Sequence, residues 1–328
     1  MKDDKHGKGH KKKKHAEGAE APLATPAEFQ PLDAEEKETA FYSDGHPLDD
    51  VHYIEAKIIL QGLRFTSVQS FFDFAKIVAK VAKRYGVDFD PMAGRGIRPQ
   101  IREVLFLDTQ DFKLYNNNFI LRRRIVYEDG FPVGEPEIVF KFRHPDRDTA
   151  AALDVRPQIP GSYRIKFKEE LLPLKGHIGG VRSLYSHNVE FPFRPRGVAD
   201  PSAASTLVKV FPPLGSVLTS GRKHVSLVNR TAVEEVLQQL GNLDFGKGML
   251  APCNVSVWRT RGDQHQLVGE FSYQVRFLRR DELSTKALER SHEFFCALQT
   301  EAQDWVSLGT TKTGAVYRLK GNPPQSHE

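Results

Sequence analysis

Polar and apolar side chains alternate along residues 163–170, and most of the polar positions are basic. Arg164, Lys166 and Lys168 share one side with Glu170, while aromatic and aliphatic residues occupy the positions between them. Because successive side chains of a β-strand point to opposite faces, this segment predicts a strand with one ionic and one apolar face. The plainest explanation is an antiparallel sheet that has one face in water.

The same basic alternation recurs in other segments and points beyond a plain solvated face. Its further basic positions are Lys57, Arg122, Arg124, Lys141 and Arg143. Eight of the ten charged residues on these polar faces are then cations, and the two acids are Glu55 and Glu170. Neighbouring like charges destabilise a sheet, so the pattern favours a face that binds a polyanion.

Eight segments carry the period of a β-strand, and three carry the period of a helix. Strands are predicted at 51–60, 103–108, 118–127, 137–143, 163–170, 222–229, 254–259 and 268–277. Helices are predicted at 67–85, at 231–240 and at 283–305, and proline- and glycine-rich loops at 86–100, 144–161, 171–202 and 211–221. Many strands with few helices predict an α+β fold rather than a doubly wound parallel sheet.

The ends of the chain differ in charge from its middle. Residues 1–15 contain seven Lys and two Asp, and residues 16–50 contain one Lys and ten acids, which leaves 39 basic and 30 acidic residues in 51–328. We expect 1–46 to be a disordered charged tail, 47–322 the folded domain, and 323–328 a disordered C-terminus. A basic folded part implies an anionic partner, such as a nucleotide, a polyphosphate, nucleic acid or a membrane surface.

Simple counts exclude several classes of protein. The two cysteines, Cys253 and Cys296, cannot make a disulfide framework or a four-ligand zinc site. No apolar run approaches the roughly 18–20 residues of a membrane-spanning helix. The basic N-terminus is not followed by the apolar stretch of a secretory signal, so we expect a cytoplasmic protein.

Several motifs follow one another in a fixed order. Glu55 and Lys57 lie two residues apart in the first predicted strand, and Asp108-Thr109 is followed after a loop by the run Leu121-Arg122-Arg123-Arg124. Basic strands at 138–143 and 166–171 and a late strand at 269–275 complete the series. In this order the motifs resemble the CYTH domain, the triphosphate tunnel metalloenzyme superfamily, over roughly residues 51–320.

The resemblance implies an antiparallel eight-stranded β-barrel, a tunnel with ionic side chains inside and helices packed outside. It also implies a hydrolase of inorganic triphosphate, polyphosphate or a nucleoside triphosphate. Basic side chains would hold the phosphate chain, and carboxylates would hold Mg²⁺ or Mn²⁺. Arg and Lys would stabilise the charge that spreads over the phosphoryl oxygens in the transition state.

Carried over position by position, the resemblance assigns three roles inside the tunnel. The predicted catalytic residues are Glu55 and Lys57, and the predicted metal ligands are Glu55, Glu170 and Glu270. The predicted phosphate-binding residues are Arg122, Arg124, Lys141, Arg143, Arg164, Lys166, Lys168 and Lys312. Arg222 or His224 is expected to line a further strand, and the spacing does not choose between them.

Two departures from the family pattern affect the predicted metal site. Tyr53 stands where the first Glu of the opening motif belongs, and Ser272 stands where the last Glu of the late strand belongs. Metal-assisted phosphoryl transfer needs negatively charged ligands, and the sequence keeps the basic set better than the acidic set. Two functions therefore stay open: a metal-dependent hydrolase, and a non-catalytic protein that binds a phosphate chain. Nucleic-acid binding is disfavoured because aromatic residues are not interleaved on the basic face.

Overall fold

The computed structural model of the chain describes residues 40–92, 98–192, 202–218 and 224–321. The strands of this part are β1 (Tyr53–Leu60), β2 (Asp88–Pro91), β3 (Gln100–Asp108), β4 (Phe119–Glu128), β5 (Phe131–His144), β6 (Arg164–Leu174), β7 (His177–Pro192), β8 (Ser226–Asp244), β9 (Leu250–Thr260) and β10 (Gln266–Arg276). The α-helices are α1 (Val68–Arg84), α2 (Lys113–Asn116), α3 (Arg147–Ala152), α4 (Ala204–Val210), α5 (Thr285–Glu301) and α6 (Lys312–Tyr317). Three short 3-10 helices accompany them, η1 (Gly62–Arg64), η2 (Pro212–Ser216) and η3 (Arg280–Glu282).

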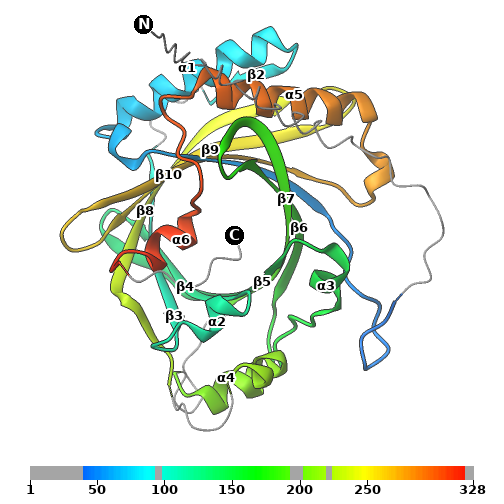
Figure 1. Cartoon of the computed structure of the whole chain (residues 1–328), viewed down its shortest axis with the longest axis vertical. Helices are drawn as coiled ribbons and strands as arrows, with labels where there is room; N and C mark the ends of the chain where they lie inside the picture. The colour runs from blue at the N-terminus through cyan, green and yellow to red at the C-terminus, as the bar shows by residue number, and fades with distance from the viewer. Residues whose placement is uncertain (1–39, 93–97, 193–201, 219–223, 322–328) are drawn as a thin grey trace, which may run out of the picture. The chain divides into compact units, whose positions relative to one another are not determined.

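Nine of the strands form a closed barrel (Figure 1). The order around the ring is β8-β3-β4-β5-β7-β6-β1-β10-β9, and β9 pairs back onto β8 to close it. The neighbours β1 and β6 run parallel, whereas the other neighbouring strands are antiparallel. Strand β2 lies outside the ring and pairs with β8.

The predicted fold class, an α+β barrel with helices outside, is confirmed. Two details of the prediction are corrected, because the barrel has nine strands instead of eight and contains one parallel pair. The helices predicted at 67–85 and 283–305 are α1 and α5. Most of the predicted tail, 1–46, and the predicted C-terminal segment, 323–328, lie outside the described residues. Within 40–46, Tyr42 is buried and its hydroxyl donates to Asp49, so the described fold begins before residue 47.

Residues 231–240 belong to β8, so the helix predicted there is wrong. Val233, Val236 and Leu237 have a spacing that suits a helix, yet the backbone pairs with β3 on one side and with β9 on the other. Pairing on both edges satisfies the backbone of a strand as fully as a helix would. Closure of the barrel therefore overrides the local helical preference.

Strand β7 lies within 171–202, where the sequence predicted a loop. Its outward side chains include Val189 and Phe191, which pack in an apolar cluster, and they alternate with Asn188 and Glu190. This alternation is present in the sequence but is preceded by Gly179 and Gly180, which are typical of loops.

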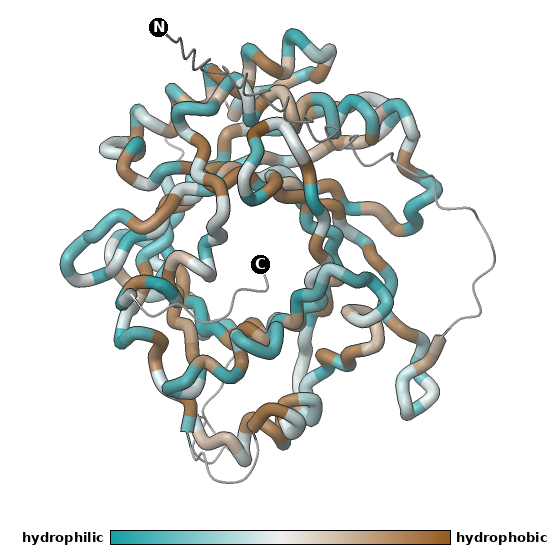
Figure 2. The backbone as a smooth tube through the Cα atoms, in the orientation of Figure 1, coloured by the Kyte–Doolittle hydropathy of each residue, from teal (hydrophilic) through white to brown (hydrophobic). Residues whose placement is uncertain are grey.

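The apolar faces of the barrel strands point away from the barrel axis. One apolar cluster packs beneath α1 and α5 and contains the fully buried Phe74, Phe271 and Phe294. A second cluster packs beneath α3 and α4, where the ring centroids of Phe140 and Phe211 are 4.1 Å apart. Figure 2 shows hydrophobic and hydrophilic residues alternating along the strands of the ring. Most of the hydrophobic core therefore surrounds the barrel instead of filling it.

Helix α6 lies inside the ring (Figure 1) and is an exception to this arrangement. Its Val316 and Tyr317 pack with Phe106 and Trp258 in a third apolar cluster. Helix α6 begins at Lys312, so this packing also holds the Lys312 side chain inside the barrel.

Asp108, in the most specific of the sequence motifs, is a buried centre of hydrogen bonds. Its carboxylate accepts the backbone N–H groups of Thr109, Leu114 and Tyr115 at 2.7, 2.9 and 3.0 Å. It also accepts the hydroxyl of Tyr317 at 3.1 Å. One side chain thus connects β3 to α2 and to α6, which is a structural role.

Replacing Asp108 by Ala should destabilise the protein because four donors lose their buried acceptor. Since a buried unsatisfied donor costs about 1–3 kcal/mol, we expect the free energy of unfolding, measured by chemical denaturation, to fall by about 2–4 kcal/mol. Asp73→Ala is the matched control, because the Asp73 carboxylate bonds Gln69 and Lys76 on the exposed side of α1. That control should leave the free energy of unfolding nearly unchanged, because exposed ion pairs contribute little to stability. Equal losses in the two variants would contradict the structural role.

Candidate functional site

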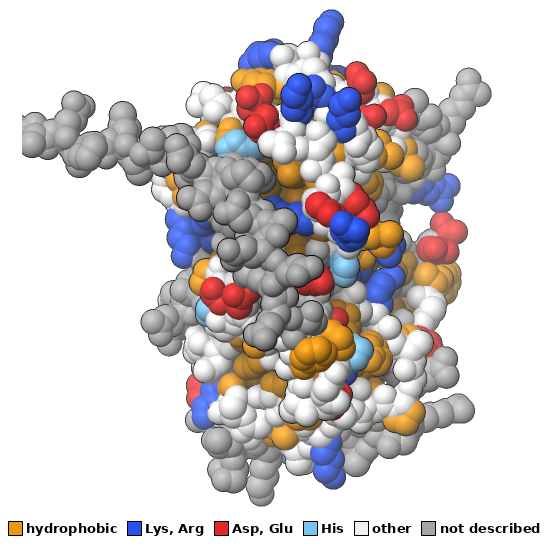
Figure 3. Space-filling model, turned by 90° about the vertical axis from the view of Figure 1, so that its right-hand side faces the viewer, with side chains coloured by type: hydrophobic (Ala, Val, Ile, Leu, Met, Phe, Trp, Pro, Cys, Tyr) orange, Lys and Arg blue, Asp and Glu red, His pale blue; other side chains and the backbone are white. Residues whose placement is uncertain are grey.

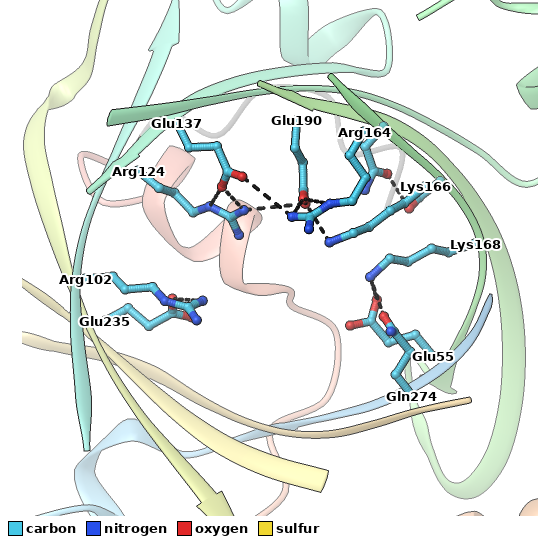
Figure 4. A network of polar contacts seen from close by, with 12 residues as sticks. Glu55, Arg102, Arg124, Glu137, Arg164, Lys166, Lys168, Glu190, Glu235 and Gln274 are labelled. Carbon is cyan, nitrogen blue, oxygen red and sulfur yellow. Dashed lines mark hydrogen bonds and ion pairs between the residues drawn. The ribbon is translucent and has the colours of Figure 1, made fainter. Parts of the chain in front are cut away.

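The polar faces of the barrel strands point toward the barrel axis (Figure 4). The charged residues of this interior, termed the interior network, are Glu55, Lys57, Arg102, Arg122, Arg124, Glu137, Lys141, Arg143, Arg164, Lys166, Lys168, Glu170, Glu190, Glu235, Glu270 and Lys312. Every residue predicted to bind phosphate or metal lies in this set, and their roles stay predictions. Arg222 lies outside the described residues, and His224 is exposed beside Ser202.

Glu170 is fully buried at the centre of three cations, termed the Glu170 triad: Lys57, Lys141 and Arg143. Its Oε1 lies 2.6 Å from Nζ of Lys141 and 2.8 Å from Nζ of Lys57, and its Oε2 lies 3.1 Å from Nη2 of Arg143. Burial would raise the pKa of Glu170, but Arg143, Lys141 and Lys57 hold it well below its usual range. The carboxylate is therefore ionised although water does not reach it.

Glu190 lies at the centre of a second group, termed the Glu190 triad: Arg124, Arg164 and Lys166 (Figure 4). Its Oε2 is 2.5 Å from Nη2 of Arg164 and 2.8 Å from Nζ of Lys166, and its Oε1 is 3.4 Å from Nη2 of Arg124. Glu137 pairs with the same Arg124. Burial would raise the pKa of Glu190, but Lys166 and Arg124 lower it to about 2.

A third group joins helix α6 to the wall. Nζ of Lys312 lies 3.2 Å from Oε1 of Glu235 and 2.8 Å from Oε1 of Glu270. Glu235 also lies 3.5 Å from Nη1 of Arg102 and accepts the indole N–H of Trp258 at 2.8 Å. Burial opposes the ionised form of Glu235, but Lys312 and Arg102 lower its pKa to about 2.

Positive charge is in excess within the interior network. Among the described residues it contains ten cations and six carboxylates, a surplus of four when each group has its ordinary charge. The Glu170 triad and Lys168 together have four cations and two carboxylates, Glu170 and Glu55. The Glu190 triad and Arg122 together also have four cations and two carboxylates, Glu190 and Glu137. The cations around Glu235 are balanced by acids. The excess therefore lies on the wall made by β4, β5, β7, β6 and β1.

Arg122 is the cation with the least compensation. Among the described residues no ion pair is found for its guanidinium, and its buried Nε has no hydrogen-bond partner. Burial and the neighbouring Arg124 lower the pKa of Arg122 to about 10. Burial and Arg143 likewise hold the pKa of Lys141 well below its usual range, and burial lowers the pKa of Lys166. An anion placed against these groups would favour their charged forms.

Two of the three predicted metal ligands, Glu55 and Glu170, bind the ammonium of Lys57, and the third, Glu270, binds that of Lys312. Nζ of Lys57 lies 3.0 Å from Oε2 of Glu55 and 2.8 Å from Oε1 of Glu170. Although burial would lower it, the pKa of Lys57 is raised above its usual range by Glu170, Glu55 and Glu270. Within the described ranges, no three His, Cys, Asp or Glu side chains are arranged to hold a metal ion. The residues present therefore do not fit Mg²⁺ or Mn²⁺, which need free carboxylate oxygens.

The two departures from the family pattern make contacts of other kinds. Nζ of Lys168 lies 5.7 Å from the ring centroid of Tyr53, and the guanidinium of Arg276 lies 6.0 Å from it. The hydroxyl of Ser272 donates to the side chain of Asn254 at 3.3 Å. Neither Tyr53 nor Ser272 brings the negative charge that a divalent cation needs.

The outer surface differs from the interior. On the face drawn in Figure 3, basic and acidic side chains lie interspersed among polar and hydrophobic ones. Exposed pairs such as Arg279 with Asp281 belong to this kind of surface and contribute little to stability. Each helix of the described ranges is too short or too polar to cross a membrane.

A cleft of about 780 Å³ borders the interior network beside Arg102. Gln100 and Arg102 of β3 line it together with Tyr127 and Arg261, whose guanidinium lies 4.6 Å from the Tyr127 ring centroid. Arg102 is itself a member of the interior network and pairs with Glu235, so the cleft reaches the network at this residue.

Sequence reasoning missed four members of the interior network: Arg102, Glu137, Glu190 and Glu235. Glu190 lies on β7, which was predicted as a loop, and Glu235 lies in the segment predicted as a helix. Glu137 alternates in phase with Lys141 on β5, so the period-two pattern contained this signal. Arg102 precedes the predicted strand 103–108 by one residue.

Comparison with known proteins gives likenesses to solved structures alone, since no family model and no curated sequence matches the chain. A candidate adenylyl cyclase from Hippeastrum, described as having a dominant triphosphatase activity, is 13% identical, with 85% of this chain and 100% of that chain covered and a TM-score of 0.37. A candidate adenylate cyclase from Bacillus halodurans is 11% identical, with 83% and 98% covered and a TM-score of 0.35. The barrel described above has the closed ring, ionic interior and outer helices that the resemblance to the CYTH domain implies, and it differs in its ninth strand and its one parallel pair.

The pKa of Glu190 predicts a loss of stability in acid. Because this pKa lies below its ordinary value of 4.5, the Glu190 triad stabilises the fold fully above pH 4.5 and loses this contribution as the pH falls through about 2. Between about pH 6 and pH 2, the free energy of unfolding should fall by about 3 kcal/mol more in the wild type than in Glu190→Gln. Denaturant titrations at several pH values measure this difference, and parallel curves for the two proteins would contradict it.

Proposed function

We propose that the interior of the barrel binds a linear phosphate chain without the help of a divalent metal. The ligand would be triphosphate, polyphosphate or the phosphate end of a nucleotide. The observation that carries this proposal is the buried surplus of positive charge, in which Arg122 forms no ion pair with a described carboxylate. Buried cations without full compensation are costly, so an anion of matching shape stabilises the interior.

Phosphate suits the side chains of the charged wall. Arg contacts phosphate oxygens with two parallel hydrogen bonds, and Lys contacts them as a compact charge. Asn188 on β7 is the register partner of both Lys141 on β5 and Lys166 on β6, which places an amide between two ammonium groups. Because the surplus is spread over several strands, a ligand with repeated charges matches it better than a single small anion.

Metal-dependent hydrolysis, the first function predicted from the sequence, has less support from the geometry. It requires Glu55, Glu170 and Glu270 to offer oxygens to a divalent cation. Lys57 and Lys312 already bind these carboxylates. The second function predicted from the sequence, a phosphate-chain binding protein, requires no change in these contacts.

Isothermal titration calorimetry with tripolyphosphate in the presence of EDTA tests the proposal. The wild type should bind without metal, and binding should weaken as the salt concentration rises. Arg122→Ala should lower the affinity about tenfold or more, because a charge-assisted hydrogen bond is lost. Arg123→Ala is the matched control, since Arg123 is adjacent in sequence and points to the outer face, and it should leave the affinity unchanged. No binding by the wild type at low salt would overturn the proposal.

A phosphate-release assay separates binding from hydrolysis. We expect tripolyphosphate to remain intact during incubation with the protein and Mg²⁺ or Mn²⁺, because Lys57 occupies the position between Glu55 and Glu170. Release that depends on the metal and disappears in Glu55→Gln would replace the binding proposal with hydrolysis.

A further inference from the structure

An ordinary ion pair joins one carboxylate to one cation, whereas Glu170 and Glu190 each contact three cations. Each carboxylate is surrounded by three cations that reach it from neighbouring strands, and the two glutamates are 0% and 5% exposed. Glu55 adds a second carboxylate at Lys57, and Glu137 adds one at Arg124, so three cations face two carboxylates in each group. Among the described residues, each triad therefore stays electropositive with its glutamate in place. A phosphoryl group carries more oxygens and more charge than a carboxylate, and it suits such a triad better.

The two triads are neighbours on the barrel wall. Lys141 of the Glu170 triad and Lys166 of the Glu190 triad flank Asn188 in the strand register. Adjacent strands lie about 4.8 Å apart, so the two ammonium groups start from backbones about two strand spacings apart. A single chain of phosphoryl groups can therefore reach both triads at the same time.

We propose that Glu170 and Glu190 are built-in counter-anions, which hold the two triads together in the free protein and are displaced by the phosphoryl groups of the ligand. This inference rests on the proposed function and identifies what determines affinity and selectivity at that site. The glutamates stabilise the interior without ligand and compete with the ligand for the same cations. Orthophosphate displaces one glutamate at most, whereas a longer chain replaces both, so the interior selects against small anions.

The test compares two substitutions that each remove one negative charge from the protein. Glu190→Gln removes the carboxylate at the centre of a triad. Glu169→Gln removes a carboxylate on β6 that is adjacent in sequence to the interior residues Lys168 and Glu170, points to the outer face and pairs with Arg280. Calorimetry with tripolyphosphate and EDTA should show about ten- to hundredfold tighter binding for Glu190→Gln than for the wild type. Glu169→Gln should bind within about threefold of the wild type, because Arg280 lies outside the interior network.

Each outcome bears on a different statement. Equal gains in the two variants would attribute the effect to net charge and overturn the counter-anion role. Unchanged or weaker binding by Glu190→Gln, while the wild type binds, would also overturn it and would leave the proposed function intact. No binding by the wild type and both variants would overturn the proposed function together with this inference.

A shorter carboxylate covers the case in which Glu190→Gln does not fold. Glu190→Asp keeps the negative charge but withdraws it from the centre of the triad, so the cations stay compensated. This variant should fold, as judged by its thermal unfolding, and should bind tripolyphosphate more tightly than the wild type by a smaller factor than Glu190→Gln. Binding no tighter than that of the wild type would overturn the proposal.

Discussion

The fold depends on the compensation of buried charges inside a closed ring of strands. An ionised group away from water is costly unless opposite charges and hydrogen bonds replace its hydration. Here Glu170 and Glu190 each replace that hydration with three cations. Loss of one member would leave the others buried without compensation, so the inner side chains act as a unit.

This interior is possible because the hydrophobic core lies elsewhere. The apolar faces of the strands pack outward against α1, α5, α3 and α4, which stabilises the ring without filling it. Among the described helices, α6 alone enters the ring, where it is held by aromatic packing and by the hydrogen bond from Tyr317 to Asp108. The stability of the barrel and the chemistry of its interior are thus assigned to opposite faces of the same strands.

Local periodicity predicted a large part of this arrangement. Alternation along β1, β4, β5, β6 and β10 was sufficient to place Lys57, Arg122, Lys141, Lys166 and Glu270 on one polar face, and the family resemblance turned that face inward. The sequence could not show which acid each cation meets, because Glu190 contacts residues of β4 and β6 that are distant along the chain. The position of Lys57 among the predicted metal ligands was equally hidden, since it depends on how β1 lies beside β6. Barrel closure, which converts 231–240 into a strand, is likewise a property of the whole ring.

The number of strands has a consequence for the chemistry of the wall. Strand directions cannot alternate all the way around a ring with an odd number of members, so a nine-stranded ring must contain a seam where two neighbours run the same way. That seam lies between β1 and β6, and Glu55 and Glu170 face each other across it in register. Two like charges in such a position repel, and the ammonium of Lys57 between them removes the repulsion. The odd number of strands thus requires a parallel pair, and in this pair Glu55 and Glu170 lie side by side with Lys57 compensating both charges.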